Sequence, residues 1–304
     1  GCKIMLRGLR SIIPAAGEAT RLRPHTLVKQ KPMLPMGSDG KKIIDWSLNV
    51  ASQTESTTVT LHFDESKTKD LENHLESKKD KVAALRDSRR MGAASLIAFS
   101  YDLFEPYPEG NSLILPADHV VENINLSEFY EKHLEMDADV TILGVDIKPY
   151  GQYIHAHNGT VGEISDHPGG SEYMSSSGIY IISNIKLLEW IARNKRNGWN
   201  GEHRSLMRDF ITPLIYTGNV VSHRLPDEGY WDDAGTIKRY YDNNMRLSLS
   251  NNVLDDEATI GGEATVSRSV LIGSTAIKSG IIDAEIISSD GLNQYSTKIY
   301  NRRQ

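Results

Sequence analysis

The chain has 304 residues, 39% of them hydrophobic, which suits one large globular domain with a small appendage. Its 40 acidic and 34 basic residues leave a net charge of −6, which argues against general affinity for nucleic acid or membrane surfaces but leaves phosphorylated small molecules open. Cys2 is the only cysteine, no apolar run reaches membrane-spanning length, and the N-terminus lacks a signal-peptide pattern. We therefore expect a soluble protein of the reducing cytoplasm.

Strand-like runs alternate with amphipathic stretches along the first part of the chain. The predicted strands are residues 10–14, 57–62, 112–115, 140–145 and 179–182. The predicted helices are residues 44–51, 67–75 and 126–133, the last preceded by Asn125 as an N-cap. This alternation predicts βα units and an α/β domain with a Rossmann-like, mostly parallel sheet over residues 1–245.

The spacing of the hydrophobic residues changes after about residue 250. Aliphatic residues then recur every five or six positions, with small residues between them: Ile260, Val266, Leu271, Ile277, Ile282 and Ile287. This period predicts a short left-handed parallel β-helix over residues 246–304, and a few irregular antiparallel strands are the alternative. The apolar edges of so short a solenoid predict that it docks against the main domain or a second subunit, and hence a homo-oligomer.

The stretch IIPAAGEATRLRPHT, residues 12–26, ends a strand in a loop of small residues with arginines. A loop at the carboxyl end of a parallel strand presents free N–H groups to the crevice, which suits an anion. Gly17 allows close approach of a ligand, and Arg21 adds a planar cation that can bind phosphate oxygens in pairs. Taken alone, the stretch fits an ordinary βα turn with a surface arginine equally well.

Three motifs in order carry a family resemblance: GEATRLRPHTLVKQKPMLP from residue 17, LILPADHV from residue 113 and GYWDDAGT from residue 229. The chain resembles the sugar-1-phosphate nucleotidyltransferases from its first loop to Asn244. The resemblance implies transfer of a nucleotidyl group from a nucleoside triphosphate to a sugar or cyclitol 1-phosphate, with release of pyrophosphate. Many members of the family also end in a left-handed β-helix, which agrees with the repeat.

The resemblance also implies roles for individual residues. Asp118 and Asp233 would bind Mg²⁺, Arg21 the triphosphate, and Lys31 the phosphates near the reacting centre. The loop would cradle the substrate with Ala16, Gly17, Glu18, Ala19 and Thr20. Catalysis of this reaction would consist mostly of positioning and charge neutralisation, because the sugar phosphate and the triphosphate are both anions and must be brought together.

Three neighbours compete for these roles. Asp232 adjoins Asp233 and Lys29 precedes Lys31 by two residues, but the motifs favour Asp233 and Lys31. His119 follows Asp118, and we expect it to pack or to donate a hydrogen bond instead of taking part in catalysis.

The sequence departs from the family pattern at two positions. Ala19 stands where the family usually has a second glycine, and a left-handed backbone there would cost about 1 kcal/mol or more. Asp166 and His167 replace the usual Glu-Lys pair, whose lysine binds the sugar phosphate; a histidine can do so only when it is protonated. Gly178 is expected under the sugar and Gly92 near the base, without indicating which base or sugar is bound.

Two other functions are alternatives to nucleotidyl transfer. A non-catalytic sensor of nucleotides or sugar phosphates would explain Ala19 and His167, but it need not keep both aspartates. Acyl transfer by the C-terminal repeat needs a basic histidine there, and the sequence has none after His223.

Overall fold

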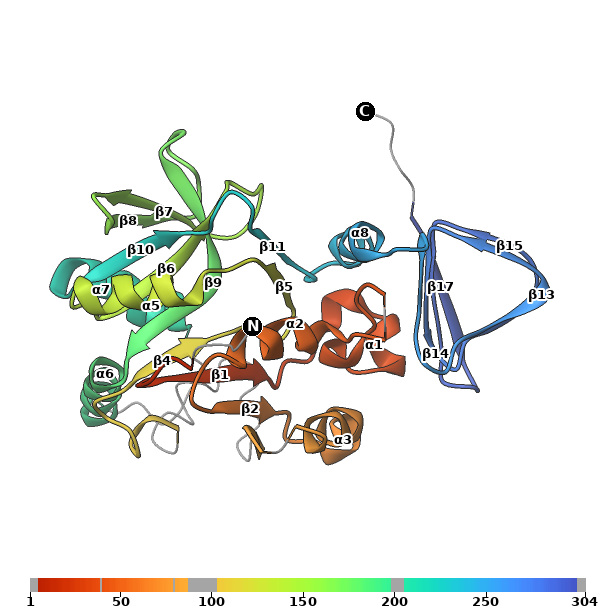
Figure 1. The fold of residues 1–304 in the computed structure, drawn as a ribbon, viewed down its shortest axis with the longest axis horizontal. Coiled ribbons are helices and arrows are strands. Elements are labelled where there is room, and N and C mark those ends of the chain that lie inside the picture. Colours follow the sequence, from red (N-terminus) through yellow and green to blue (C-terminus); the bar gives the residue numbers. More distant parts are fainter. Residues whose placement is uncertain (1–4, 39, 79, 87–102, 198–204, 300–304) are drawn as a thin grey trace.

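The computed structural model describes residues 5–38, 40–78, 80–86, 103–197 and 205–299. It has an α/β body and, beside it, a C-terminal coil of stacked strands (Figure 1). A sheet of nine strands runs through the body in the order β3-β2-β1-β4-β9-β6-β10-β8-β7. Within the described ranges, every helix is too short or too polar to cross a membrane.

The N-terminal half of the sheet is parallel, as the sequence predicts. Its strands are β1 (Leu9–Ala15), β2 (Thr57–Leu61), β3 (Val82–Arg86) and β4 (Asn111–Ile114). The central strand β1 pairs in parallel with β2 on one side and with β4 on the other. The loop after β1 therefore opens at the carboxyl edge of a parallel sheet, where α/β folds bind ligands.

The other half of the sheet is mixed, which corrects the expectation of a mostly parallel sheet. It contains β6 (Val140–Val145), β7 (Tyr153–His157), β8 (Thr160–Ser165), β9 (Tyr173–Ser183) and β10 (Val220–Arg224). The predicted strand 179–182 is the end of β9, which runs antiparallel between β4 and β6. A hairpin of β7 and β8, with no crossover helix, joins β6 to β9, and parallel neighbours need such a crossover.

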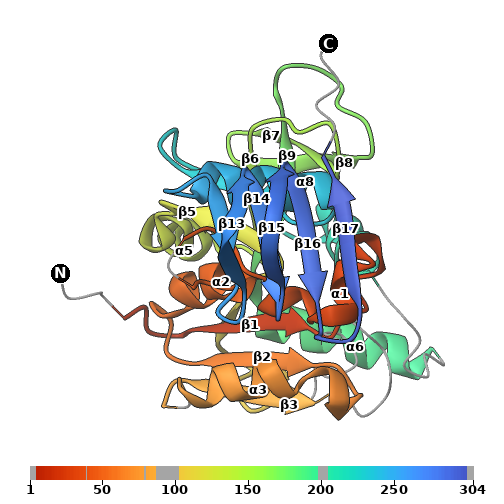
Figure 2. The same cartoon turned by 90° about the vertical axis from the view of Figure 1, so that its right-hand side faces the viewer.

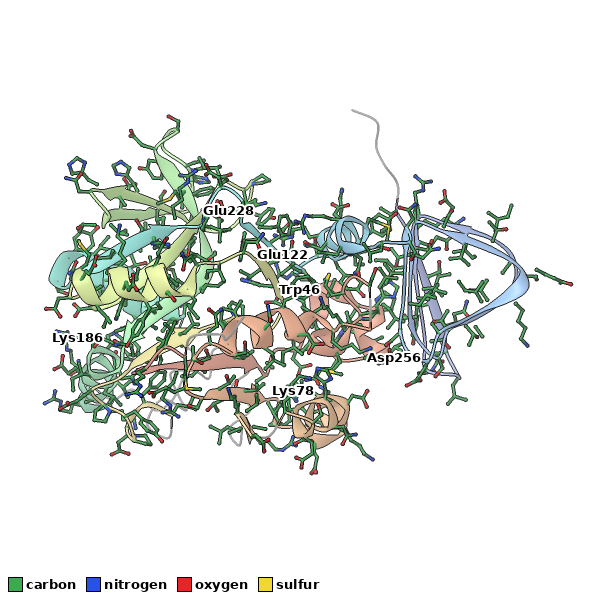
Figure 3. The ribbon with its side chains drawn as sticks, in the orientation of Figure 1. Trp46, Lys78, Glu122, Lys186, Glu228 and Asp256 are labelled. Atoms are coloured by element: carbon green, nitrogen blue, oxygen red, sulfur yellow. The ribbon has the colours of Figure 1, made fainter. Side chains whose placement is uncertain are left out.

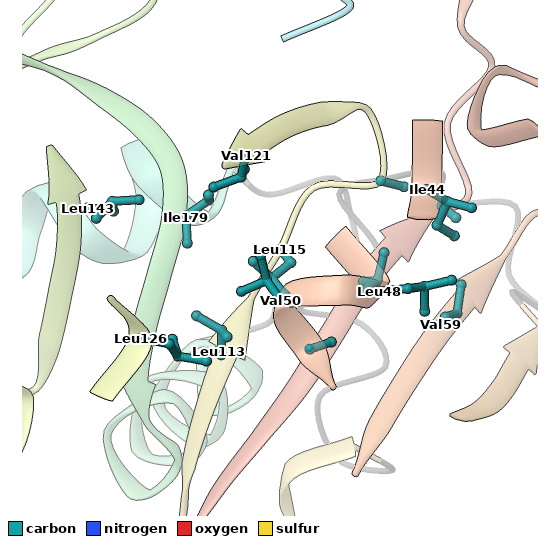
Figure 4. Packing of buried hydrophobic residues seen from close by; sticks show 14 of the residues in the cluster. Ile44, Leu48, Val50, Val59, Leu113, Leu115, Val121, Leu126, Leu143 and Ile179 are labelled. Carbon is teal, nitrogen blue, oxygen red and sulfur yellow. The ribbon is translucent and has the colours of Figure 1, made fainter. Parts of the chain in front are cut away.

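Most of the helices pack on the two faces of this sheet, while the first and the last lie beside the C-terminal coil. The helices are α1 (His25–Val28), α2 (Ile43–Ala51), α3 (Lys69–Glu76), α5 (Leu126–Glu135), α6 (Asn184–Arg196), α7 (Thr212–Thr217) and α8 (Ile237–Leu247). The alternation of β1 divides the core, since Ile13 packs with α2 and α5 on one face while Ile12 packs with α6 on the other. Figure 4 shows the first of these clusters, with Leu48 of α2 near Val59 of β2.

The three predicted helices are confirmed, with shifted ends. Asn125 caps α5 through its side-chain oxygen, which accepts a hydrogen bond from the Glu128 amide at 3.3 Å. The helix predicted at 67–75 begins at Lys69, because a 3-10 turn, Glu65–Lys67, precedes it.

The C-terminal coil, residues 252–298, is built from stacked strands, parallel except at its end. They are β12 (Asn252–Leu254), β13 (Thr259–Ser267), β14 (Ser269–Gly273), β15 (Ala276–Asp283), β16 (Glu285–Ser289) and β17 (Gln294–Lys298). Paired residues are offset by 17 positions at Asn252↔Ser269 and by 16 at Val270↔Ile286, so the chain coils at a regular period. Only β17, which ends the stack, pairs antiparallel in this coil.

Most of the predicted repeat positions face the inside of the coil. Leu271, Ile277 and Ile287 are buried in one small cluster, with Val266 and Ile282 packed against it. Ile260 is the exception, because it is 39% exposed. The register between β13 and β15 shifts just after Ile260, and such an irregularity changes the face on which a side chain lies.

An apolar face of the coil packs on the body. Val270, Ile272 and Ile286 share a buried cluster with Met36 and with Tyr240 of α8. The predicted apolar edge is thus covered, at least in part, by the main body of the same chain.

Replacing Ile272 by Ala should lower the free energy of unfolding by about 2–5 kcal/mol, because it leaves a cavity in the joint core. Ile281, which is 80% exposed, provides the matched control, and its change to Ala should have an effect within about 0.5 kcal/mol. Urea unfolding of both variants measures the difference; equal effects would contradict the packing described here.

A polar contact joins the same surfaces. His25 of α1 is 1% exposed, and its Nδ1 and Nε2 lie 2.9 Å from the hydroxyls of Ser288 and Thr297. Burial lowers the pKa of His25 to about 4. Its neutral form is therefore the one that the folded protein stabilises.

Protonation of His25 should weaken the fold as the pH falls. Because the unfolded side chain has a pKa of about 6.5, stability present above that pH is lost as the pH approaches 4, by about 2.5 kcal/mol between pH 7 and pH 4.5. The variant His25→Gln should lack this component. Urea unfolding at both pH values checks it, and parallel pH dependences of the wild type and the variant would refute it.

Candidate functional site

The loop after β1 forms one wall of a cleft of about 360 Å³. A 3-10 turn, Thr20–Leu22, follows the loop and turns the chain toward α1. Seven of the predicted site residues line this cleft: Gly17, Glu18, Ala19, Thr20, Arg21, Lys31 and Asp118. Ala16, also predicted, is fully buried behind them.

Ala19, which stands where the family usually has a glycine, has a left-handed backbone. Its φ and ψ are 48° and 39°, a conformation that costs an L-residue roughly 1–2 kcal/mol. Two hydrogen bonds hold it, since the Ala19 carbonyl accepts from the Thr26 hydroxyl at 3.0 Å and from the Leu22 amide at 3.2 Å. The loop keeps the shape that a glycine would allow without strain.

Strand pairing brings the two predicted aspartates to one place. β5 (His119–Glu122) and β11 (Tyr230–Asp233) form an antiparallel ribbon in which Asp233 lies opposite His119. The Ala234 amide donates to the Asp118 carbonyl at 2.9 Å, which ties the ends of the ribbon together. Two residues far apart in sequence thus become neighbours beside the loop.

Each of these carboxylates has a cationic partner. Lys31 donates to Asp118 at 2.5 Å, and Arg239 donates to Asp233 at 2.8 Å. Burial raises the pKa of Asp118, but the charges of Lys31 and then His119 outweigh it and lower the pKa to about 2. Asp118 is therefore ionised at any pH at which the protein would work.

Arg239 is a site residue that the sequence analysis missed. It stacks on the Tyr150 ring at 3.9 Å from the centroid. It also lies six residues after Asp233, in the first turns of α8, a spacing that could have indicated it. On the other side, the Arg21 guanidinium approaches the backbone of Gly235, because a Cβ added there would lie 3.2 Å from its Nη2.

The competing neighbours have other partners. Asp232 accepts hydrogen bonds from the Tyr150 hydroxyl and from the Asp233 amide, so it supports the loop. Lys29 forms an ion pair with Asp255 of the C-terminal coil, at 2.7 Å. The cleft is lined by Lys31, as the sequence analysis preferred.

His119 makes a hydrogen bond that determines its tautomer. The Trp231 indole N–H donates to its Nδ1 at 3.2 Å, so the ring proton of the neutral form is on Nε2, which faces Asp118 at 3.5 Å. Burial lowers the pKa of His119 below the ordinary value of a histidine. The side chain thus supports the Asp118 carboxylate, in line with the expectation of a hydrogen-bonding role.

Glu18 turns away from the aspartates to a second cleft of about 370 Å³ on the far side of the loop. His62 Nδ1 accepts from the Asp64 amide at 3.0 Å, so its Nε2–H donates to Glu18 at 2.8 Å. Bonds from His62 and then Lys67 lower the pKa of Glu18. The second cleft also has a cationic wall, with Arg23, Lys29, Lys31, Lys67 and Lys69.

The remaining predicted residues are distributed differently. Gly178, with φ +77°, lies next to the site, since a Cβ there would be 3.2 Å from the His119 ring. Asp166 and His167 are exposed on the turn after β8 and are not among the residues that line the cleft at Asp118. Gly92 lies outside the described residues.

The comparisons with known proteins agree with this geometry. The family model described as nucleotidyl transferase matches residues 10–249. The chain belongs to this family. The match begins in β1 and ends just after α8, so it includes the loop, Lys31 and both aspartates.

Glucose-1-phosphate adenylyltransferases are among the curated proteins that the chain resembles. The small chloroplastic/amyloplastic subunit of Triticum aestivum is 25% identical over 279 residues, which cover 78% of this chain and 58% of that protein. The enzyme of Clostridium botulinum is 27% identical over 268 residues, covering 81% and 67%. The chain thus spans about 58–67% of the length of these two relatives.

Among solved structures, a putative glucose-1-phosphate thymidylyltransferase from Bacillus anthracis, crystallised with sucrose, superposes with a TM-score of 0.62. It is 18% identical, and the match covers 79% of this chain and 95% of that one. At this identity the likeness shows the mixed α/β nucleotidyltransferase fold.

Trp231→Phe should change the tautomer of His119, because it removes the N–H that donates to Nδ1. In the wild type at pH 7, ¹⁵N NMR of the imidazoles should show His119 protonated at Nε2 alone; the variant should show a mixture. The control is Trp46→Phe, since the buried Trp46 indole N–H has no acceptor among the described residues. An unchanged His119 spectrum in Trp231→Phe would rule out this orienting bond.

Proposed function

We propose that the chain transfers a nucleotidyl group from a nucleoside triphosphate to a sugar or cyclitol 1-phosphate and releases pyrophosphate. The observation that carries the proposal is that Lys31 and Asp118 pair in the cleft formed by the Gly17–Arg21 loop, while strand pairing brings Asp233 opposite His119, the residue after Asp118. Membership of the nucleotidyl transferase family supports it, and so do the activities named for the curated relatives.

The donor set of the site fits Mg²⁺. This ion prefers oxygen ligands and usually keeps several waters, so one or two carboxylates plus substrate phosphates satisfy it. Asp118 and Asp233 provide two carboxylates, and no group of three or more potential ligands occurs among the described residues. We propose that they hold Mg²⁺, which would neutralise phosphate charge.

The protein's own residues would then position and neutralise two anions. An oxygen of the sugar phosphate attacks the α-phosphorus, the bond to the β-phosphate breaks, and pyrophosphate leaves with its electron pair. Arg21 and the loop N–H groups would bind the departing phosphates, and Lys31 would stay near the reacting centre. The cationic second cleft would bind any negatively charged part of a substrate that extends past the loop.

The other parts of the molecule complete the proposal. We propose that residues 1–245 form the catalytic unit and that the C-terminal coil, within 246–304, is a left-handed β-helix. Its repeat of 16–17 residues supports this view. Gly178 would lie under the sugar, Gly92 would lie near the base, and Asp166 and His167 would contact the sugar phosphate. A homo-oligomer in the cytoplasm remains part of the proposal.

The test is pyrophosphate release with Mg²⁺ across a panel of nucleoside triphosphates and sugar 1-phosphates, including glucose 1-phosphate, at pH 6 and pH 8. One pairing should give release, and Asp118→Asn should reduce it by about 100-fold or more. The control is Asp146→Asn on an exposed ion pair with Arg224, which should retain activity. Full activity of Asp118→Asn would exclude the proposed site. Nucleotide binding without release from any pairing would favour the sensor instead.

A further inference from the structure

The segment that links the nucleotide loop to α2 is held by the C-terminal coil. Residues 24–31 include α1 and end at Lys31, and α1 lies against β16 (Figure 2). The segment is also coupled to the loop, because the Thr26 hydroxyl donates to the strained Ala19 carbonyl. A shift of this segment would therefore move both Lys31 and the loop.

Asp255 of the coil is the centre of this contact. Its side chain is fully buried, and it accepts from Lys29 at 2.7 Å, from Lys42 at 2.8 Å and from the Gly273 amide at 2.9 Å. Asp256 beside it is 69% exposed and pairs with Lys42 alone (Figure 3 shows its position at the junction of body and coil).

A buried ion cluster of this kind costs desolvation energy that its attractions offset only in part. Removing one partner leaves an uncompensated charge, so the cluster strongly favours a single arrangement of the elements that bear the charges. Here Lys29 precedes Lys31 by two residues, and Lys42 is the N-cap of α2. The carboxylate of Asp255 is thus linked through Lys29 to the segment that carries Lys31, and through Lys42 to the start of α2.

We propose that Asp255 is a positioning residue of the nucleotide site, acting through Lys29 to hold the loop and Lys31 in place. This inference rests on the proposed function. It makes the C-terminal coil a structural part of the phosphate site, although the coil itself lines neither the cleft at Asp118 nor the second cleft.

The test compares Asp255→Asn and Lys29→Met with the controls Asp256→Asn and Lys42→Met in the full chain. Both test variants should raise the Kd for the matching nucleoside triphosphate, measured by calorimetry, and the KM for it by about tenfold or more, while kcat falls less than threefold. Both controls should stay within about twofold. A merely structural weakening of the fold would not separate KM from kcat in this way, nor Lys29 from Lys42.

Trypsin cleavage at the Arg21–Leu22 bond, followed by mass spectrometry, provides a readout that does not depend on nucleotide. Cleavage should be faster in Asp255→Asn and Lys29→Met than in the wild type and the controls. A folded Asp255→Asn with unchanged cleavage and unchanged Kd would overturn the inference. If Asp255→Asn does not fold, Lys29→Met decides by the cleavage rate alone, because Lys29 also lines the second cleft and its loss can weaken nucleotide binding directly. If the wild type neither binds a triphosphate nor releases pyrophosphate, the proposed function fails, and the cleavage rates still report whether Asp255 holds the loop.

Discussion

The antiparallel pairing of β5 with β11 is the constraint on which the candidate site depends. It sets Asp233 opposite His119, the residue after Asp118, and Asp118 lines the cleft where the loop after β1 opens. A slip of one residue would turn every side chain of a strand to its other face. Since Trp231 of β11 also orients His119 of β5, the same pairing that joins the aspartates fixes the side chain between them.

Charge compensation is the second organising feature. Two carboxylates at one place repel each other, and in this protein each has its own cation, Lys31 for Asp118 and Arg239 for Asp233. The pairs keep the acids ionised in a partly buried position, and they place positive charge where phosphates would bind. The same principle recurs at the joint with the coil, where two lysines surround Asp255.

The packing of the C-terminal coil on the body is the third feature. So few stacked strands have little core of their own, and the buried cluster inside the coil is small. The coil is stable because its other apolar face packs on the body, with Ile272 and Ile286 against residues of the body. That packing brings Asp255, Ser288 and Thr297 to the segment that follows the loop after β1.

The sequence by itself determined what depends on local patterns: three of the four strands of the parallel half (β3 was not predicted), the cap at Asn125, most of the repeating interior of the coil, and the motifs of the family that contain Arg21, Lys31, Asp118 and Asp233. Hydrophobic periodicity and short motifs record such features directly. Only the tertiary structure decided the antiparallel course of β9, the outward turn of Ile260, the left-handed Ala19 and the partners Arg239 and Asp255. Each of these depends on contacts between segments far apart in the chain, and the residue types at either end of such a contact do not specify which of many possible partners will meet.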